Sequence, residues 1–166
     1  MRKQIINQGT GNRSAANEQW LDIEQLAQVE VTSEDATHPI ESALIPGAGS
    51  GWRAGTYGLQ TIRLLFDEPQ RINRIRLLFQ EDERQRTQQF VLRWSSGGSQ
   101  SYREIVRQQY NFSSPASTTE CEDYTVNLDG VTALELMIVP DISGAPALAS
   151  LAQLRSTHLN HPVAVS

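Results

Sequence analysis

The feature that most constrains the fold of this chain is a series of short segments in which apolar and polar residues alternate. Residues 72–79, for example, place Ile75, Leu77 and Phe79 on one face and two arginines on the other. A period of two is typical of half-buried strands. Comparable segments cover residues 26–33, 59–66, 90–94, 102–107, 124–128 and 133–139, and residues 147–155 close the series as a final strand or a helix. About eight antiparallel strands at this spacing, without a sustained helical period, predict an all-β sandwich.

One Gly-rich loop interrupts the series. It spans residues 43–54 and carries one proline and three glycines within positions 46–51, immediately before Trp52 and Arg53. A buried loop of this length would leave backbone polar groups without partners, so we expect it at the rim of the sandwich.

Length and composition favour one domain. The chain has 166 residues, enough to bury roughly two thirds of the surface that the unfolded chain exposes. Residues 1–24 are mostly polar and are interpreted as an N-terminal arm, residues 25–156 as the β-sandwich, and residues 157–166 as a C-terminal tail.

The charge balance argues against several function classes. Fourteen basic and nineteen acidic residues give a net charge of −5, which makes nucleic acid an unlikely partner. The apolar stretches are too short to span a bilayer, which predicts no membrane partner. The basic start lacks the apolar core of a signal peptide, so we expect the protein in the cytoplasm.

No motif predicts catalysis. The sequence has no nucleophile elbow, phosphate-binding loop or dinucleotide fingerprint. Of its three histidines only His158 and His161, three apart in the tail, have a spacing that could hold a metal, and a disordered tail is the better interpretation. The acidic clusters at residues 81–83 and 120–123 are interpreted as solvated charges rather than paired catalytic carboxylates. We therefore expect no enzyme activity, cofactor or metal.

Binding is better supported, because ligand sites on sandwich rims combine aromatic rings with a few fixed polar groups. Three segments supply such groups, in the Gly-rich loop, in residues 80–89 and in residues 108–115. The candidate ligand-binding residues are Trp52, Arg53, Tyr57, Arg84, Arg86, Tyr110, Asn111 and Phe112. For Trp52 a second interpretation stands, namely a core residue that packs beneath the loop.

The order of these segments resembles the discoidin family, also called the coagulation factor type C or galactose-binding-domain-like family. The resemblance rests on residues 29–33, the 43–54 loop, residues 61–69, the 72–79 strand and residues 149–155, and it covers residues 25–156. It implies a jelly-roll sandwich that recognises a carbohydrate or a similar polar ligand through rim loops, without catalysis.

The chain departs from the family pattern in two ways. Members that hold a structural calcium have a Glu in the last strand, where this chain has Gln153. An amide is a poorer ligand for a hard cation than a carboxylate, which argues against calcium. Secreted members join their ends by a disulfide, which the single cysteine, Cys121, excludes.

Two other functions remain open. A protein–protein scaffold, which includes a homo-oligomer, would use Arg74, Arg76 and Arg93 on one exposed sheet face and an arm docked on a neighbouring molecule. A DNA-binding role would follow from similarity to the amino-terminal domain of X-ray repair scaffold proteins, carried by residues 52–54, 61–62 and 112–115. The net charge makes this role the weakest of the three.

Overall fold

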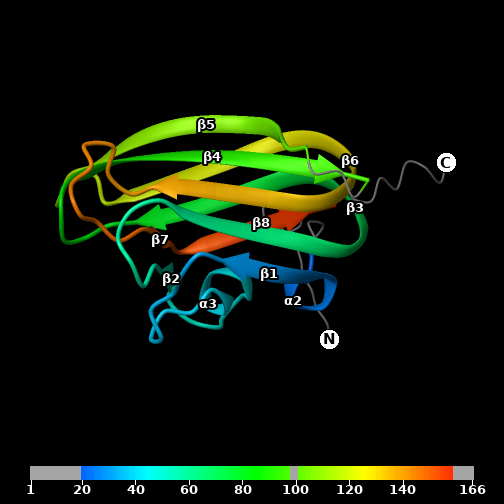
Figure 1. Ribbon diagram of the computed structural model, residues 1–166, viewed down its shortest axis with the longest axis horizontal. Helices are drawn as coiled ribbons and strands as arrows, with labels where there is room; N and C mark the ends of the chain where they lie inside the picture. Colours follow the sequence, from blue (N-terminus) through cyan, green and yellow to red (C-terminus); the bar gives the residue numbers. More distant parts are fainter. Residues whose placement is uncertain (1–19, 98–100, 159–166) are drawn as a thin grey trace, which may run out of the picture.

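The computed structural model describes residues 20–97 and 101–158 (Figure 1). Two short helices and eight strands follow one another as α2 (Ile23–Leu26), β1 (Ala27–Val31), α3 (Glu41–Leu44), β2 (Trp52–Arg53), β3 (Gln60–Gln80), β4 (Arg86–Ser96), β5 (Arg103–Phe112), β6 (Thr119–Val139), β7 (Ser150–Leu151) and β8 (Gln153–Thr157). The predicted all-β class is confirmed, and the closing segment is a pair of strands rather than a helix.

The two longest strands, β3 and β6, each run through both layers of the sandwich. Their first pairing, Gln60–Leu65 with Ala133–Ile138, ends at bulges between Leu65 and Gln70, and their second pairing continues to Gln80 and Thr119. Both ribbons turn back at the same end of the molecule in Figure 1. One layer has the order β1-β3-β6-β4-β5, and the other is formed by the second half of β3 between β8 and the first half of β6.

The core lies between these layers. Ile62 and Leu64 face it from the first half of β3, and Ile75, Leu77 and Phe79 face it from the second half, all at most 1% exposed. Their burial confirms the predicted inward faces, since strand residues two apart lie on the same side of a sheet.

The ends of the described chain pack against each other. Trp20 forms a bridge with Thr157, and the Leu21 N–H donates to the Ser156 carbonyl at 2.8 Å. The Asp22 side chain then caps α2. Residues 20–24 of the predicted arm are thus part of the packed body, whereas residues 1–19 and the tail residues 159–166 lie outside the described part of the chain.

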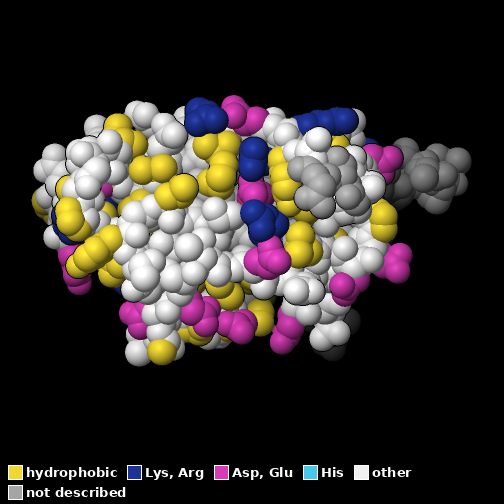
Figure 2. Space-filling model, viewed as in Figure 1, with side chains coloured by type: hydrophobic (Ala, Val, Ile, Leu, Met, Phe, Trp, Pro, Cys, Tyr) yellow, Lys and Arg dark blue, Asp and Glu magenta, His cyan; other side chains and the backbone are white. Residues whose placement is uncertain are grey.

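A ladder of alternating charges crosses the outer face of the five-stranded layer. Glu104, Arg93, Glu135, Arg63 and Glu30 lie opposite one another in register on β5, β4, β6, β3 and β1. Figure 2 shows the ladder as alternating basic and acidic side chains with hydrophobic side chains on both sides.

The centre of the ladder is the most buried part. The Glu135 side chain is 3% exposed and accepts hydrogen bonds from Arg93 Nε at 2.8 Å and Arg63 Nη2 at 2.9 Å. Arg63 Nη1 also donates to Glu30 at 2.7 Å. Opposite charges directly across neighbouring strands stabilise one register, and a slip by one residue would bring each charge against the wrong face.

The expected exposed face of Arg74, Arg76 and Arg93 is not present. Arg74 and Arg76 lie on the second half of β3, in the layer that pairs with β8, whereas Arg93 lies on β4 in the other layer. Arg74 pairs with Asp123 at 2.7 Å and packs under the Trp20 ring. Alternation along each strand predicts that these arginines point outward. It does not reveal the bend in β3, which places Arg74 and Arg76 in a different layer from Arg93.

One acidic residue of the 120–123 cluster is not solvated as expected. Glu120 is 2% exposed, and its Oε1 accepts from Gln88 Nε2 at 3.1 Å. Burial, followed by the hydrogen bond and the charge of Glu122, raises the pKa of Glu120 to about 8. The carboxyl is therefore largely protonated at neutral pH.

We predict that Glu135→Gln destabilises the fold by about 2 kcal/mol, because it removes the charge that compensates two half-buried arginines. Glu104→Gln at the exposed end of the same ladder serves as the control and should cost less than about 0.5 kcal/mol. Urea unfolding measures both. Equal effects of the two substitutions would contradict a buried centre of the ladder.

A second prediction concerns pH. The pKa of Glu120 is higher in the folded state than in the unfolded chain, so its favourable contribution is present at low pH and is lost as pH rises toward about 8. Glu120→Gln should remove this loss and flatten the dependence of the urea midpoint on pH between about pH 5 and pH 8. Glu24→Gln, at an exposed position, should leave the wild-type dependence unchanged. The same pH dependence in Glu120→Gln and wild type would refute the assignment.

Candidate functional site

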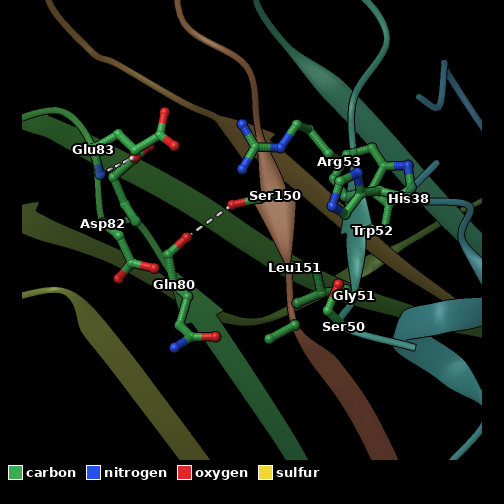
Figure 3. A pocket seen from close by; sticks show the side chains of 12 residues that line it. His38, Ser50, Gly51, Trp52, Arg53, Gln80, Asp82, Glu83, Ser150 and Leu151 are labelled. Carbon is green, nitrogen blue, oxygen red and sulfur yellow. Dashed lines mark hydrogen bonds between the residues drawn. The ribbon is translucent and has the colours of Figure 1, made fainter. Parts of the chain in front are cut away.

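The rim loops surround a polar cleft at one end of the sandwich (Figure 3). Its volume is about 190 Å³, below the range of about 300–1,000 Å³ typical of drug-sized ligands, so it suits a small polar ligand. Three segments far apart in the sequence line it: His38 with Ser50–Arg53, Gln80–Glu83, and Ser150–Ala152.

The first wall is β2 with the Gly-rich loop before it. β2 pairs with β7, so that Trp52 lies opposite Leu151 and Arg53 opposite Ser150. The Arg53 N–H donates to the His38 carbonyl at 3.1 Å, which brings the histidine to the cleft. Gly51 permits this arrangement, because its φ is +117° and a Cβ would lie 2.8 Å from both the Ala152 Cα and the Leu151 carbonyl oxygen.

The second wall is the turn between β3 and β4, which a single carboxylate holds in place. Glu81 accepts from Arg86 Nε at 2.7 Å and from the N–H groups of Glu83 and Arg84 at 3.1 and 3.3 Å. Burial opposes ionisation of Glu81, but the Arg86 hydrogen bond and charge and these N–H groups outweigh it and lower the pKa of Glu81. The turn therefore exposes Asp82 and Glu83 at the cleft.

The cleft combines donors and acceptors of hydrogen bonds. Figure 3 shows His38 and Arg53 on one side of β7 and Gln80, Asp82 and Glu83 on the other. No hydrogen bond or ion pair joins the Arg53 guanidinium, Asp82 or Glu83 to another side chain within residues 20–97 and 101–158. A fork of guanidinium donors facing free carboxylate acceptors can bind neighbouring hydroxyl groups, each of which donates and accepts.

Three of the eight candidate residues are scaffold rather than surface. Trp52 is 1% exposed and donates from Nε1 to the Ser33 carbonyl at 3.0 Å, which agrees with its interpretation as a core residue. Phe112 is fully buried, and the Arg86 guanidinium, also buried, lies 4.8 Å from its ring centroid. Trp52 is among the residues that line the cleft, but the side chains of all three residues are buried, so we expect them to support the site rather than to contact a ligand. Burial follows here from strand pairing, since β4 begins at Arg86 and β5 continues to Phe112.

The other five candidates are accessible, but only Arg53 lines the cleft. Arg84 is exposed in the turn between β3 and β4 that forms the second wall of the cleft. Tyr110 donates from its hydroxyl to the Thr119 carbonyl at the start of β6, and Asn111 accepts from Thr87 across the β4–β5 pair. Tyr57, 67% exposed, continues the rim next to β2, where the Gly58 N–H donates to the Ala147 carbonyl.

Most of the polar groups of the cleft were not among the predicted binding residues. Asp82 and Glu83 were interpreted as solvated charge, His38 was weighed only as a metal ligand, and neither Gln80 nor Ser150 was named as a binding residue. The pair of acidic residues in a short turn between two strongly alternating strand segments could have indicated a binding wall. Nothing in the sequence indicates Ser150, because only the β2–β7 pairing brings it to the loops.

The residues at the position expected for calcium do not fit that ion. Gln153 lies in β8 opposite Leu78, and the neighbouring Arg155 donates to the Ala43 carbonyl at 2.7 Å, so a guanidinium already lies against the start of the Gly-rich loop. Within the described residues there is no group of three His, Cys, Asp or Glu side chains that could hold a metal. Nor does any described helix have the length and apolar character needed to cross a membrane.

We predict that Gly51→Ala destabilises the protein by about 2 kcal/mol or more, because the added Cβ would meet backbone atoms of β7 and the loop to β8. Gly47→Ala is the matched control, since Gly47 also has a positive φ, +79°, but open space around it, and should cost about 1 kcal/mol. Thermal or urea unfolding checks both. A Gly51→Ala variant no less stable than Gly47→Ala would contradict the close approach.

Comparison with known proteins supports the fold. No protein-family model and no curated protein sequence matches the chain. The solved structures that are similar include the family 32 carbohydrate-binding module of AlyQ in complex with 4,5-unsaturated mannuronic acid, at 15% identity, TM-score 0.60 and coverage of 84% of this chain and 98% of that one.

Two modules from Clostridium perfringens are similar to the same degree. The family 32 module of NanJ in complex with galactose has 12% identity and TM-score 0.61, with 85% of this chain and 99% of that one covered. CpGH89CBM32-5 in complex with GalNAc-β-1,3-galactose has 16% identity and TM-score 0.59, with 84% and 100% covered. The chain thus has the jelly-roll fold of the family 32 carbohydrate-binding modules, and the discoidin-like sandwich predicted from the sequence is confirmed.

Proposed function

We propose that this domain is a non-catalytic module that binds a carbohydrate in the rim cleft. The observation that carries the proposal is the cleft itself, which is lined by Arg53 on one side of β7 and by Asp82 and Glu83 on the other. Structures of the same fold with sugars bound support it.

The charges indicate which sugar class fits. Arg53 can donate hydrogen bonds to two adjacent hydroxyl oxygens, while Asp82 and Glu83 can accept hydrogen bonds from hydroxyl groups. The two carboxylates outnumber the one guanidinium, so a sugar with its own carboxylate would be repelled. We therefore expect neutral sugars to bind in preference to uronic acids, and the small volume favours one ring or the end of a chain.

The test is calorimetric titration with a panel of neutral sugars and uronic acids. Arg53→Ala should weaken binding of the neutral sugar by about tenfold or more, the scale of a lost charge-assisted hydrogen-bond pair. Arg107→Ala, on the sheet face, is the matched control and should bind as the wild type does. Absence of binding across the panel, or equal loss in both variants, would refute the proposal.

A further inference from the structure

The outermost strand of the five-stranded layer, β1, has an open edge. β1 pairs with β3 on one side, and no strand among residues 20–97 and 101–158 pairs with its other side. The short helices α2 and α3 lie beyond this edge in Figure 1.

The direction of the unused backbone groups follows from two hydrogen bonds. The Ala27 N–H donates to the Ile23 carbonyl, away from β3, whereas the Thr32 N–H donates to the Thr61 carbonyl, toward β3. N–H groups alternate in direction along an antiparallel strand. The N–H and C=O groups of Val29 and Val31 therefore point out of the open edge, as in strands that accept a further strand.

The charge ladder ends at this same edge with an acidic residue. From β5 to β1 the signs alternate, and the last member, Glu30, has a half-exposed side chain that pairs with Arg63 on one side only. A strand added beside β1 would place one residue directly opposite Glu30. A Lys or Arg there would continue the alternation, and an acid would oppose it.

The inner side of the edge is an apolar groove with an acidic border. Its volume is about 300 Å³, and Ala27, Val29 and Leu44 are among the residues that line it, with the exposed Glu24 and Glu41. Between Leu21 and Trp52 the sequence contains six acidic residues and no Lys or Arg. The whole segment that forms α2, β1 and α3 therefore favours a basic occupant.

We propose that the β1 edge is an interaction surface that binds an extended, basic segment of a partner protein by strand addition. Apolar side chains of that segment enter the groove beside Val29, and alternate basic side chains lie on the outer face, one of them opposite Glu30. Hydrogen bonds to the backbone of Val29 and Val31 hold the segment, and the groove and Glu30 select its sequence.

The proposal can be tested on the complete chain with a short synthetic peptide of alternating valine and lysine. Amide hydrogen exchange should show that the peptide slows exchange at Val29 and Val31 and leaves the other edge strand, β5, unchanged. Glu30→Lys should weaken binding of the peptide by about tenfold, since an attractive cross-strand pair becomes a repulsive one. Glu104→Lys, at the opposite end of the ladder, is the matched control and should bind as the wild type does.

Peptide variants keep the test independent of the stability of the protein variants. Replacing lysine by glutamate, or the central valine by proline, should abolish protection of Val29 and Val31 in the unaltered protein. Equal protection by the glutamate peptide, or protection at β5 in place of β1, would overturn the proposal. Val29 and Val31 amides that are already protected in the protein alone would overturn it too, because the edge would then be covered by the chain itself.

Discussion

The pairing of β3 with β6 determines where every other element lies. Because the register shifts between Leu65 and Gln70 of β3, opposite Val131–Ala133 of β6, and the two strands continue to pair beyond this point, one antiparallel ladder builds both layers of the sandwich. The first half of the pair positions β1, β4 and β5, and the second half positions β8. The inward side chains of both halves meet in one core, and the end of β3 at Gln80 delivers the turn that forms a wall of the rim cleft.

Charge has different roles on the outer sheet face and at the rim. On the sheet face, Arg63 and Arg93 both pair with Glu135, and Arg63 also pairs with Glu30, so that two carboxylates balance two guanidinium groups and specify the register. At the rim, Arg86 forms an ion pair with Glu81 that holds a turn in place. Arg53, Asp82 and Glu83 therefore remain available to bind a ligand in the cleft. A count of arginines in the sequence could not separate these roles, because each depends on the carboxylate that the fold brings opposite.

Much of the fold could be predicted because strand periodicity is a local property. The inward faces of residues 75–79 and 90–92 follow from neighbouring residues alone. The ends of the strands were harder to predict from the sequence, since the polar residues at 86–89 and 108–111 pair with one another rather than form loops. The cleft was hardest, because Ser150 meets Arg53 only through the β2–β7 pairing, which no local pattern indicates.

The most direct test of the account is to map sugar binding onto the backbone by nuclear magnetic resonance. Titration of isotopically labelled protein with a neutral monosaccharide should shift the amide signals of Gln80–Glu83 and Ser150–Ala152, while those of the outer sheet face stay unchanged. Shifts confined to the sheet face or to the β1 edge would contradict the central claim that the rim cleft is the ligand site.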